Sequence, residues 1–193
     1  MYERYFEHFT EKVPLTEDEM NFIKNYLTVK KIRKRQYLLQ EGDVCKCVAF
    51  VEKGAMRLYR VNEDGSEHIV AFALDGFFIT DLYSFLTQET STYNIDAIED
   101  SELVLITRSA SDELRKLSSK YQEFILWETS KAYIQLERRI TSSISLGLEE
   151  RYQNLIAYYP DIIHHVPQHM IASYMGLTPE TLSRIRKRIS IHK

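Results

Sequence analysis

One predicted helix near the C-terminal end of the chain carries side chains that could read the edges of DNA bases. Its apolar residues Leu182, Ile185 and Ile189 recur at helical spacing and mark the buried side. The opposite side then presents four polar residues: Glu180, Ser183, Arg184 and Lys187. An arginine can hold guanine O6 and N7 together, and a glutamate can accept from cytosine N4. This pattern predicts a helix that fits the major groove.

The stretch from Gln168 to Ile189, QHMIASYMGLTPETLSRIRKRI, has the layout of two helices joined by a tight turn. Gly176 tolerates a positive φ in the turn, Thr178 is a ready N-cap, and Pro179 suits the first helical position. We expect these residues to contact DNA: Thr178, Glu180, Ser183, Arg184, Arg186, Lys187 and Arg188. The alternative is a helical hairpin whose charged side is only solvated. The turn glycine, capped start and basic cluster occur together, which favours the helix-turn-helix.

The basic residues are concentrated at this end of a chain that is acidic overall. From Arg151 to Lys193 there are six Lys or Arg and two Asp or Glu, a local charge of +4, whereas the 193-residue chain has a net charge of -3. Only the C-terminal part is therefore suited to contact phosphates. Charges interrupt every apolar stretch, so we expect a cytoplasmic protein with no signal peptide and no membrane partner.

Histidines and cysteines do not form the pattern of a metal centre. A metal-binding cupin enzyme needs two or three His and a carboxylate on facing strands, and His68 is the only histidine among the predicted strands. His164, His165 and His169 lie together in the last quarter of the chain. There, solvation or phosphate contact is favoured over metal binding. A disulfide between Cys45 and Cys47, which stand two residues apart in a predicted strand, is geometrically poor, and the chain has no other Cys to complete a metal site. We therefore expect two unrelated thiols, no metal, no cofactor and no catalytic residues.

Alternating apolar patterns bounded by turn residues predict an all-antiparallel region in the first half of the chain. Its strands are expected at Thr28–Arg33, Tyr37–Gln40, Cys47–Glu52, Ala55–Val61, Glu67–Ala73, Thr92–Ala97 and Leu103–Thr107. Turn signals at Gly42, Gly54 and Gly76 separate them. The spacing predicts a compact barrel or roll, preceded by a short helix that begins with a capping box at Thr16 and Glu19.

A longer helix is predicted from Tyr121 to Ser145, after a shorter one with Ser109 as its N-cap. Along the longer helix Tyr133, Leu136 and Ile140 keep the three-four spacing of a coiled coil, and Ile125 and Thr129 continue the row backward. Either the roll of the same molecule or the same helix of a second copy could cover this row. Helix-turn-helix proteins that bind two-fold symmetric DNA sites do so as dimers, which favours the second copy. We expect a β-roll effector-type domain at 1–120, a dimerisation helix at 121–146 and a helix-turn-helix DNA-binding domain at 147–193.

This order of roll, long helix and helix-turn-helix resembles the Crp/Fnr superfamily of bacterial transcription regulators, in particular its short members from Bacteroidetes-type bacteria. The resemblance covers nearly the whole chain and is most specific over GLTPETLSRIRKRI. It implies an α+β fold with an N-terminal antiparallel β-roll (a double-stranded β-helix, similar to cyclic nucleotide-binding domains). It also implies a wing that is truncated or absent, because the chain stops at Lys193.

The resemblance further implies a homodimeric transcription regulator that binds inverted repeats in double-stranded DNA, with RNA polymerase as a further partner. The family reads bases through a Glu and an Arg four residues apart, which correspond to Glu180 and Arg184. An arginine that precedes the Glu in the family is Pro179 here, so the preferred half-site is expected to differ. The target promoters, and activation or repression, stay open.

An effector pocket is also implied by the resemblance, at Asp81, Leu82, Thr90 and Ser91. Cyclic nucleotide-binding members carry a phosphate-pairing arginine where this chain has Thr90, and Asp81 stands at the position of a ribose-binding glutamate. A buried phosphate without its guanidinium partner loses a charge-assisted pair, so we do not expect control by cAMP. The effector is then another small molecule, or none. The alternative is a regulator that responds to a cyclic nucleotide or another anion through Arg57 or Arg60.

Overall fold

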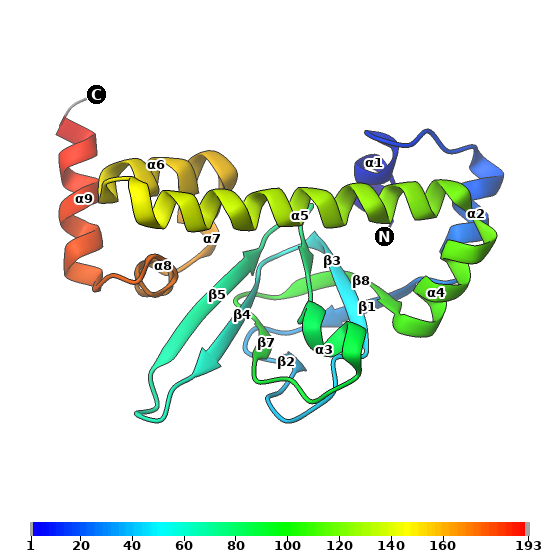
Figure 1. Ribbon diagram of the computed structural model, residues 1–193, viewed down its shortest axis with the longest axis horizontal. Coiled ribbons are helices and arrows are strands. Elements are labelled where there is room, and N and C mark those ends of the chain that lie inside the picture. The colour runs from blue at the N-terminus through cyan, green and yellow to red at the C-terminus, as the bar shows by residue number, and fades with distance from the viewer. Residues whose placement is uncertain (1, 192–193) are drawn as a thin grey trace.

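The computed structural model describes residues 2–191 and confirms the α+β architecture, with a β-roll beneath one long helix (Figure 1). The strands are β1 (Thr28–Ile32), β2 (Tyr37–Leu39), β3 (Cys47–Lys53), β4 (Met56–Val61), β5 (Glu67–Ala73), β6 (Phe78–Ile79), β7 (Asn94–Ala97) and β8 (Ser101–Thr107). The helices are α1 (Glu3–Thr10), α2 (Glu17–Lys24), α3 (Leu82–Thr87), α4 (Arg108–Leu117), α5 (Ser119–Ser145), α6 (Leu148–Tyr158), α7 (Ile162–His165), α8 (Gln168–Met175) and α9 (Pro179–Ile191).

Two antiparallel sheets form the roll, with strand orders β1-β8-β3-β6 and β2-β7-β4-β5. Side chains alternate along each strand, so Met56 and Leu58 of β4 enter the core between the sheets, whereas Arg57 and Tyr59 lie on the outer face. All the predicted strands are confirmed within two residues at each end. The short β6 was not predicted, because only its pairing with β3 makes it a strand.

The capping box of α2 is confirmed. Thr16 Oγ1 accepts from the Glu19 amide at 3.3 Å, and the Glu19 carboxylate accepts from the Thr16 amide at 2.8 Å. The prediction of Ser109 as the N-cap of the next helix is wrong. Thr107 caps α4 instead, with its hydroxyl 3.2 Å from the Ala110 amide, because Thr107 ends β8 in an extended conformation that suits an N-cap.

The long helix α5 crosses the roll and joins the N-terminal helices to α6–α9 (Figure 1). The predicted helix is confirmed, although it begins two residues earlier, with Ser118 as its N-cap. Its first turns belong to an aromatic core in which Phe124 stacks on Phe9, with the ring centroids 4.0 Å apart. From Leu126 onward most large apolar side chains are exposed, whereas Trp127 is half-buried against the aromatic core. Among residues 2–191, no helix is long and apolar enough to cross a membrane.

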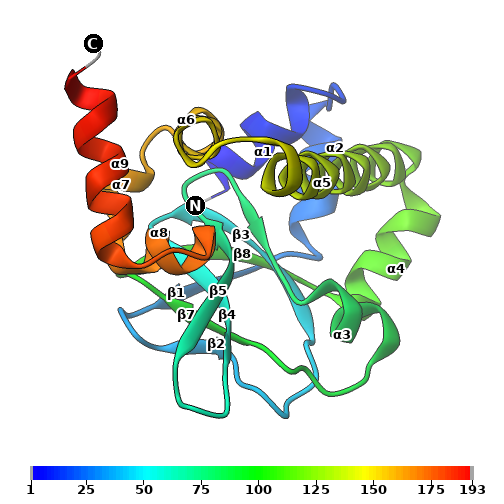
Figure 2. The ribbon, with the colours of Figure 1, turned by 60° about the vertical axis from the view of Figure 1, so that its left-hand side comes forward.

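The C-terminal helices pack against the outer face of the β2-β7-β4-β5 sheet. Figure 2 shows α8 beside β4 and β5. One continuous apolar cluster contains Tyr59 and Phe72 from the roll together with Tyr159, the C-cap residue of α6, and Ile171 of α8. The helices that carry the predicted DNA-reading residues therefore share a core with the roll.

Candidate nucleic-acid interface and effector pocket

The turn between α8 and α9 has the geometry that the glycine predicted. Gly176 ends α8 at φ 70°, and the Leu177 amide donates to the Ala172 carbonyl at 2.9 Å, which closes the last turn. Thr178 Oγ1 then accepts from the Thr181 amide at 3.3 Å and starts α9. Ala172 and Leu182 are fully buried, so the two helices cross closely at these positions. The helix-turn-helix is confirmed.

The outward side of α9 is exposed from Glu180 to Arg188. The exposed residues include Glu180, Ser183, Arg184, Lys187 and Arg188, whereas Leu182 and Ile185 lie in the core. The pKa of the Glu180 carboxyl is lowered, first by its backbone amide at the helix start, then by the Thr178 hydroxyl and the Arg184 charge. This carboxylate is therefore ionised at neutral pH and ready to accept hydrogen bonds.

Two arginines lie at the flanks of this face. Arg188 Nη1 is 3.5 Å from the Glu149 carboxylate at the start of α6. Arg186 is half-buried on the opposite flank, and its Nη1 donates to the Gln168 side-chain oxygen of α8 at 3.3 Å. The structure therefore brings Glu180, Ser183, Arg184 and Lys187 together, and it turns Arg186 towards α7 and α8.

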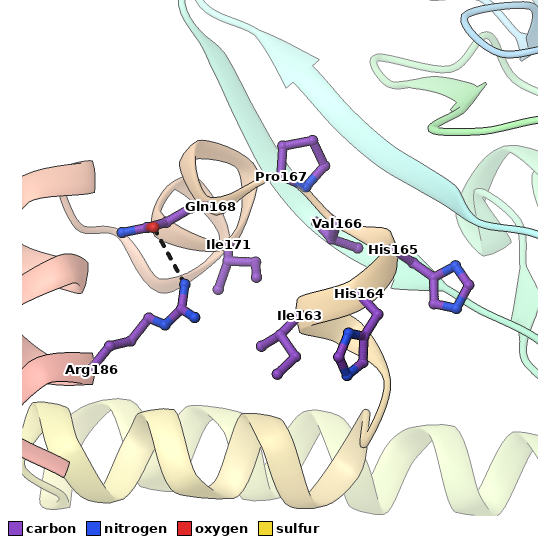
Figure 3. Close-up of a pocket in the computed structure, with 8 residues that line it drawn as sticks. All are labelled: Ile163, His164, His165, Val166, Pro167, Gln168, Ile171 and Arg186. Carbon is purple, nitrogen blue, oxygen red and sulfur yellow. Dashed lines mark hydrogen bonds between the residues drawn. The ribbon is translucent and has the colours of Figure 1, made fainter. Parts of the chain in front are cut away.

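Arg186 borders a hollow of about 350 Å³ between α7, α8 and α9. The lining residues are Ile163, His164, His165, Val166, Pro167, Gln168, Ile171 and Arg186 (Figure 3). His165 Nδ1 lies 2.8 Å from the Glu99 carboxylate of the roll, whereas His164 is exposed. The polar lining consists of imidazole, amide and guanidinium groups, which suits a phosphate at the edge of a DNA groove.

Of the four predicted pocket residues, Asp81 and Ser91 are joined by a hydrogen bond, whereas Leu82 and Thr90 point outwards. Asp81 caps α3 by accepting from the Ser84 amide at 3.3 Å, and the Ser91 hydroxyl donates to its second oxygen at 2.7 Å. Asp81 and Ser91 are buried, whereas Leu82 is 47% exposed and Thr90 is exposed. A carboxylate therefore occupies the start of α3, where an anion would otherwise be attracted by the helix dipole.

Neither alternative arginine faces the roll interior. The Arg57 guanidinium lies on the outer face of the sheet, where Asp96 and Glu67 accept from it and the Tyr59 ring stacks on it at 4.0 Å. Arg60 is exposed near the end of β4. The sequence contained a signal for the outward direction of Arg57. Side chains alternate along a strand, and the apolar Met56 and Leu58 on either side of Arg57 are expected to face the core.

The two thiols lie in different settings. Cys45 precedes β3, so the prediction that both cysteines lie in one strand is wrong. Cys45 is buried, with its sulfur 3.4 Å from the Thr80 hydroxyl oxygen. Burial, and then the neighbouring Cys45, raises the pKa of the Cys47 thiol to about 11. Within residues 2–191, no three His, Cys, Asp or Glu side chains are grouped as metal ligands.

Comparison with known proteins relates this architecture to a family of regulators. Residues 29–118, most of the roll, match the cyclic nucleotide-binding domain family. The anaerobic regulatory protein of Haemophilus influenzae is 28% identical over 188 residues, which cover 90% of this chain and 72% of that protein.

Two solved structures share the fold. FixK2 from Bradyrhizobium japonicum has a TM-score of 0.70 at 20% identity, covering 86% of this chain and 85% of that chain. The catabolite activator protein of Thermus thermophilus has a TM-score of 0.54 at 19% identity, covering 96% of this chain and 87% of that chain.

Proposed function

The chain belongs to the Crp/Fnr superfamily, and from this we propose that it is a homodimeric, sequence-specific DNA-binding transcription regulator that cAMP does not control. The relatives that it matches include an anaerobic regulatory protein and a fumarate and nitrate reduction regulatory protein, which supports a regulator over an enzyme. The observation that carries the proposal is the exposed side of α9, where Glu180 and Arg184 project from a helix anchored by buried Leu182 and Ile185. Arg184 reads guanine and Glu180 accepts from cytosine in the major groove.

In this proposal the chain has three functional segments. Residues 1–120 form the effector-type roll, 121–146 the dimerisation helix, and 147–193 the DNA-binding domain. Lys187 and Arg188, with Arg186 at the hollow beside α8, contact the phosphate backbone, and Thr178 and Ser183 add hydroxyl contacts. The protein acts in the cytoplasm, where DNA and RNA polymerase are its macromolecular partners.

Dimerisation through α5 is supported by the apolar side chains that this helix leaves exposed. The row consists of Leu126 (68% exposed), Tyr133 (69%), Leu136 (53%) and Ile140 (52%), with Ile144 (79%) beside its end. It follows coiled-coil spacing from Leu126, because Ile125 is half-buried against the protein's own aromatic core. A contiguous apolar row of this kind is typical of a protein interface, and a second α5 offers the matching row.

The absence of cAMP control is supported by the charges at the start of α3. A Kd of 1 μM corresponds to about 8 kcal/mol of binding free energy. The Asp81 carboxylate, bound to the Ser84 amide and the Ser91 hydroxyl, would repel a phosphate there. Thr90 supplies no opposing charge, and Arg57 is held by Asp96 on the other face of its sheet. Neither Thr90 nor Arg57 therefore offers a guanidinium to a phosphate at the start of α3.

The match of residues 29–118 to cyclic nucleotide-binding domains favours one alternative, a regulator that responds to a cyclic nucleotide or another anion. The two functions differ in what changes DNA affinity. We would select binding sites from a random duplex library with the natural protein, alone and with cAMP or cGMP. If the regulator is independent of cAMP, the same inverted repeat should be selected equally well without a nucleotide, with cAMP and with cGMP. Selection that depends on a nucleotide would support the alternative, and failure to select any duplex sequence would contradict both.

A further inference from the structure

Strand β5 is an outer strand of its sheet, and the C-terminal helices satisfy its outward backbone groups. The Ser173 hydroxyl of α8 accepts from the Ile69 amide at 3.0 Å and donates to the Glu67 carbonyl at 2.9 Å. The hydroxyl of Tyr159, the C-cap residue of α6, donates to the Phe72 carbonyl at 3.0 Å. Side chains therefore close this edge where another strand would otherwise pair.

A further contact comes from α5. Strand β5 has a bulge opposite Leu58 and Tyr59 of β4, which leaves Val70 without a partner in the ladder. Arg139 Nη1 donates to the Val70 carbonyl at 2.6 Å, and its Nη2 lies 3.4 Å from the Tyr174 carbonyl of α8. The guanidinium also stacks on the Tyr174 ring at 4.0 Å. One side chain therefore joins α5, the roll edge and the last turn of α8.

We propose that Arg139 is a positioning residue, which fixes the direction in which α8 and α9 face relative to α5. Ser173 and Tyr159 join the C-terminal helices to the roll alone, whereas Arg139 also ties them to α5. The inference rests on the proposed function, in which two α5 helices pair at the dimer axis. The orientation of each α9 relative to α5 then sets the spacing between the two half-sites.

Geometry as well as charge is required at this position. A guanidinium is planar, so it can donate to two carbonyls and stack on an aromatic ring at the same time. Lysine at this position would keep the charge and reach one carbonyl, but it would lose the stacked plane. The conservative variant Arg139→Lys should therefore keep only part of the natural preference for one half-site spacing. If the role of Arg139 were purely electrostatic, Arg139→Lys would keep all of it.

The test compares Arg139→Gln and Arg139→Lys with Arg138→Gln, which removes a charge from an exposed neighbour on the same helix. Duplexes that carry the selected half-sites at a series of spacings are titrated with each dimer. Arg139→Gln should bind the preferred spacing about tenfold more weakly, the effect of one or two lost hydrogen bonds, and should discriminate less between spacings. The selected bases and the dimer dissociation constant should not change. Arg138→Gln should keep the natural spacing preference.

Hydrogen exchange provides a readout that does not depend on DNA. In Arg139→Gln, the amides of β5 and of the last turn of α8 should exchange several-fold faster, while those of β3 and β8 keep their natural rates. Unchanged exchange at β5 and α8, or an unchanged spacing preference, would overturn the positioning role. If no form binds DNA, the proposed function fails, and the exchange rates still decide whether Arg139 holds the C-terminal helices in place.

Discussion

Arg57 and Asp96 form a buried, two-point ion pair across the neighbouring strands β4 and β7. The Nε–Oδ1 and Nη2–Oδ2 distances are 2.7 and 2.9 Å, and the two residues are 7% and 4% exposed. Glu67 accepts from the same guanidinium, and the Tyr59 ring lies against it. A guanidinium held in this way stabilises the outer face of the roll, and releasing it to a ligand would leave the buried Asp96 carboxylate without its charged partner.

Asp96→Ala should lower the free energy of unfolding by about 3 kcal/mol, because it leaves a buried guanidinium with only Glu67 as a charged partner. Urea unfolding, followed by circular dichroism, measures this loss. The double variant Arg57→Met with Asp96→Leu is the control, and it should recover most of the stability because neither charge remains buried. A loss below about 1 kcal/mol for Asp96→Ala would mean that the pair contributes little.

The local pattern of the sequence predicted the elements that their own residues define. Strand β5 has the predicted bounds, and the turn at Gly176 and the cap at Thr178 lie where the sequence placed them. Contacts between distant segments were not predictable in this way. The role of Arg139 depends on a bulge at Val70, 69 residues earlier, and bulges leave no clear local signal.

The candidate site was predictable to a similar extent. Helical periodicity was sufficient to place Glu180 and Arg184 on one exposed side of α9. It could not show that Arg186 turns towards Gln168, because that depends on how α7 and α8 pack. The sequence also placed the start of the apolar row on α5 at Ile125. In the structure the exposed row starts at Leu126, because the aromatic core partly covers Ile125, and only the tertiary structure shows this.

Ile140→Asp should convert the dimer to a monomer, because it places a charge in the middle of the exposed apolar row of α5. Light scattering coupled to size exclusion measures the mass directly. Ile163→Asp is a matched control, since Ile163 is 41% exposed but lies on α7, away from the row. An Ile140→Asp protein that stays dimeric, with unchanged circular dichroism, would exclude α5 as the interface.

Arg184→Ala and Lys187→Ala should weaken DNA binding in different ways. Loss of a bidentate arginine contact costs about 1–3 kcal/mol and relaxes the preference at one base of each half-site. Loss of a phosphate contact weakens binding to all sequences and reduces the dependence on salt. Binding-site selection and titrations at several salt concentrations separate the two effects. Arg60→Ala, at an exposed position of the roll, is the control and should bind like the natural protein. An unchanged selected motif for Arg184→Ala would remove its base-reading role.

Calorimetric titration should detect no micromolar binding of cAMP or cGMP to the natural protein or to Thr90→Arg. The variant adds a guanidinium at the position of the missing family arginine, but the Asp81 carboxylate stays at the start of α3, bound to Ser84 and Ser91. That carboxylate would still repel a phosphate at the start of α3. Thr90→Arg with Asp81→Asn removes the repulsion and should bind more tightly than either protein. Micromolar binding by the natural protein would show that other residues form an anion site and would overturn the proposal of cAMP-independent regulation. If the double variant also fails to bind, the roll lacks more of a nucleotide site than these two positions provide.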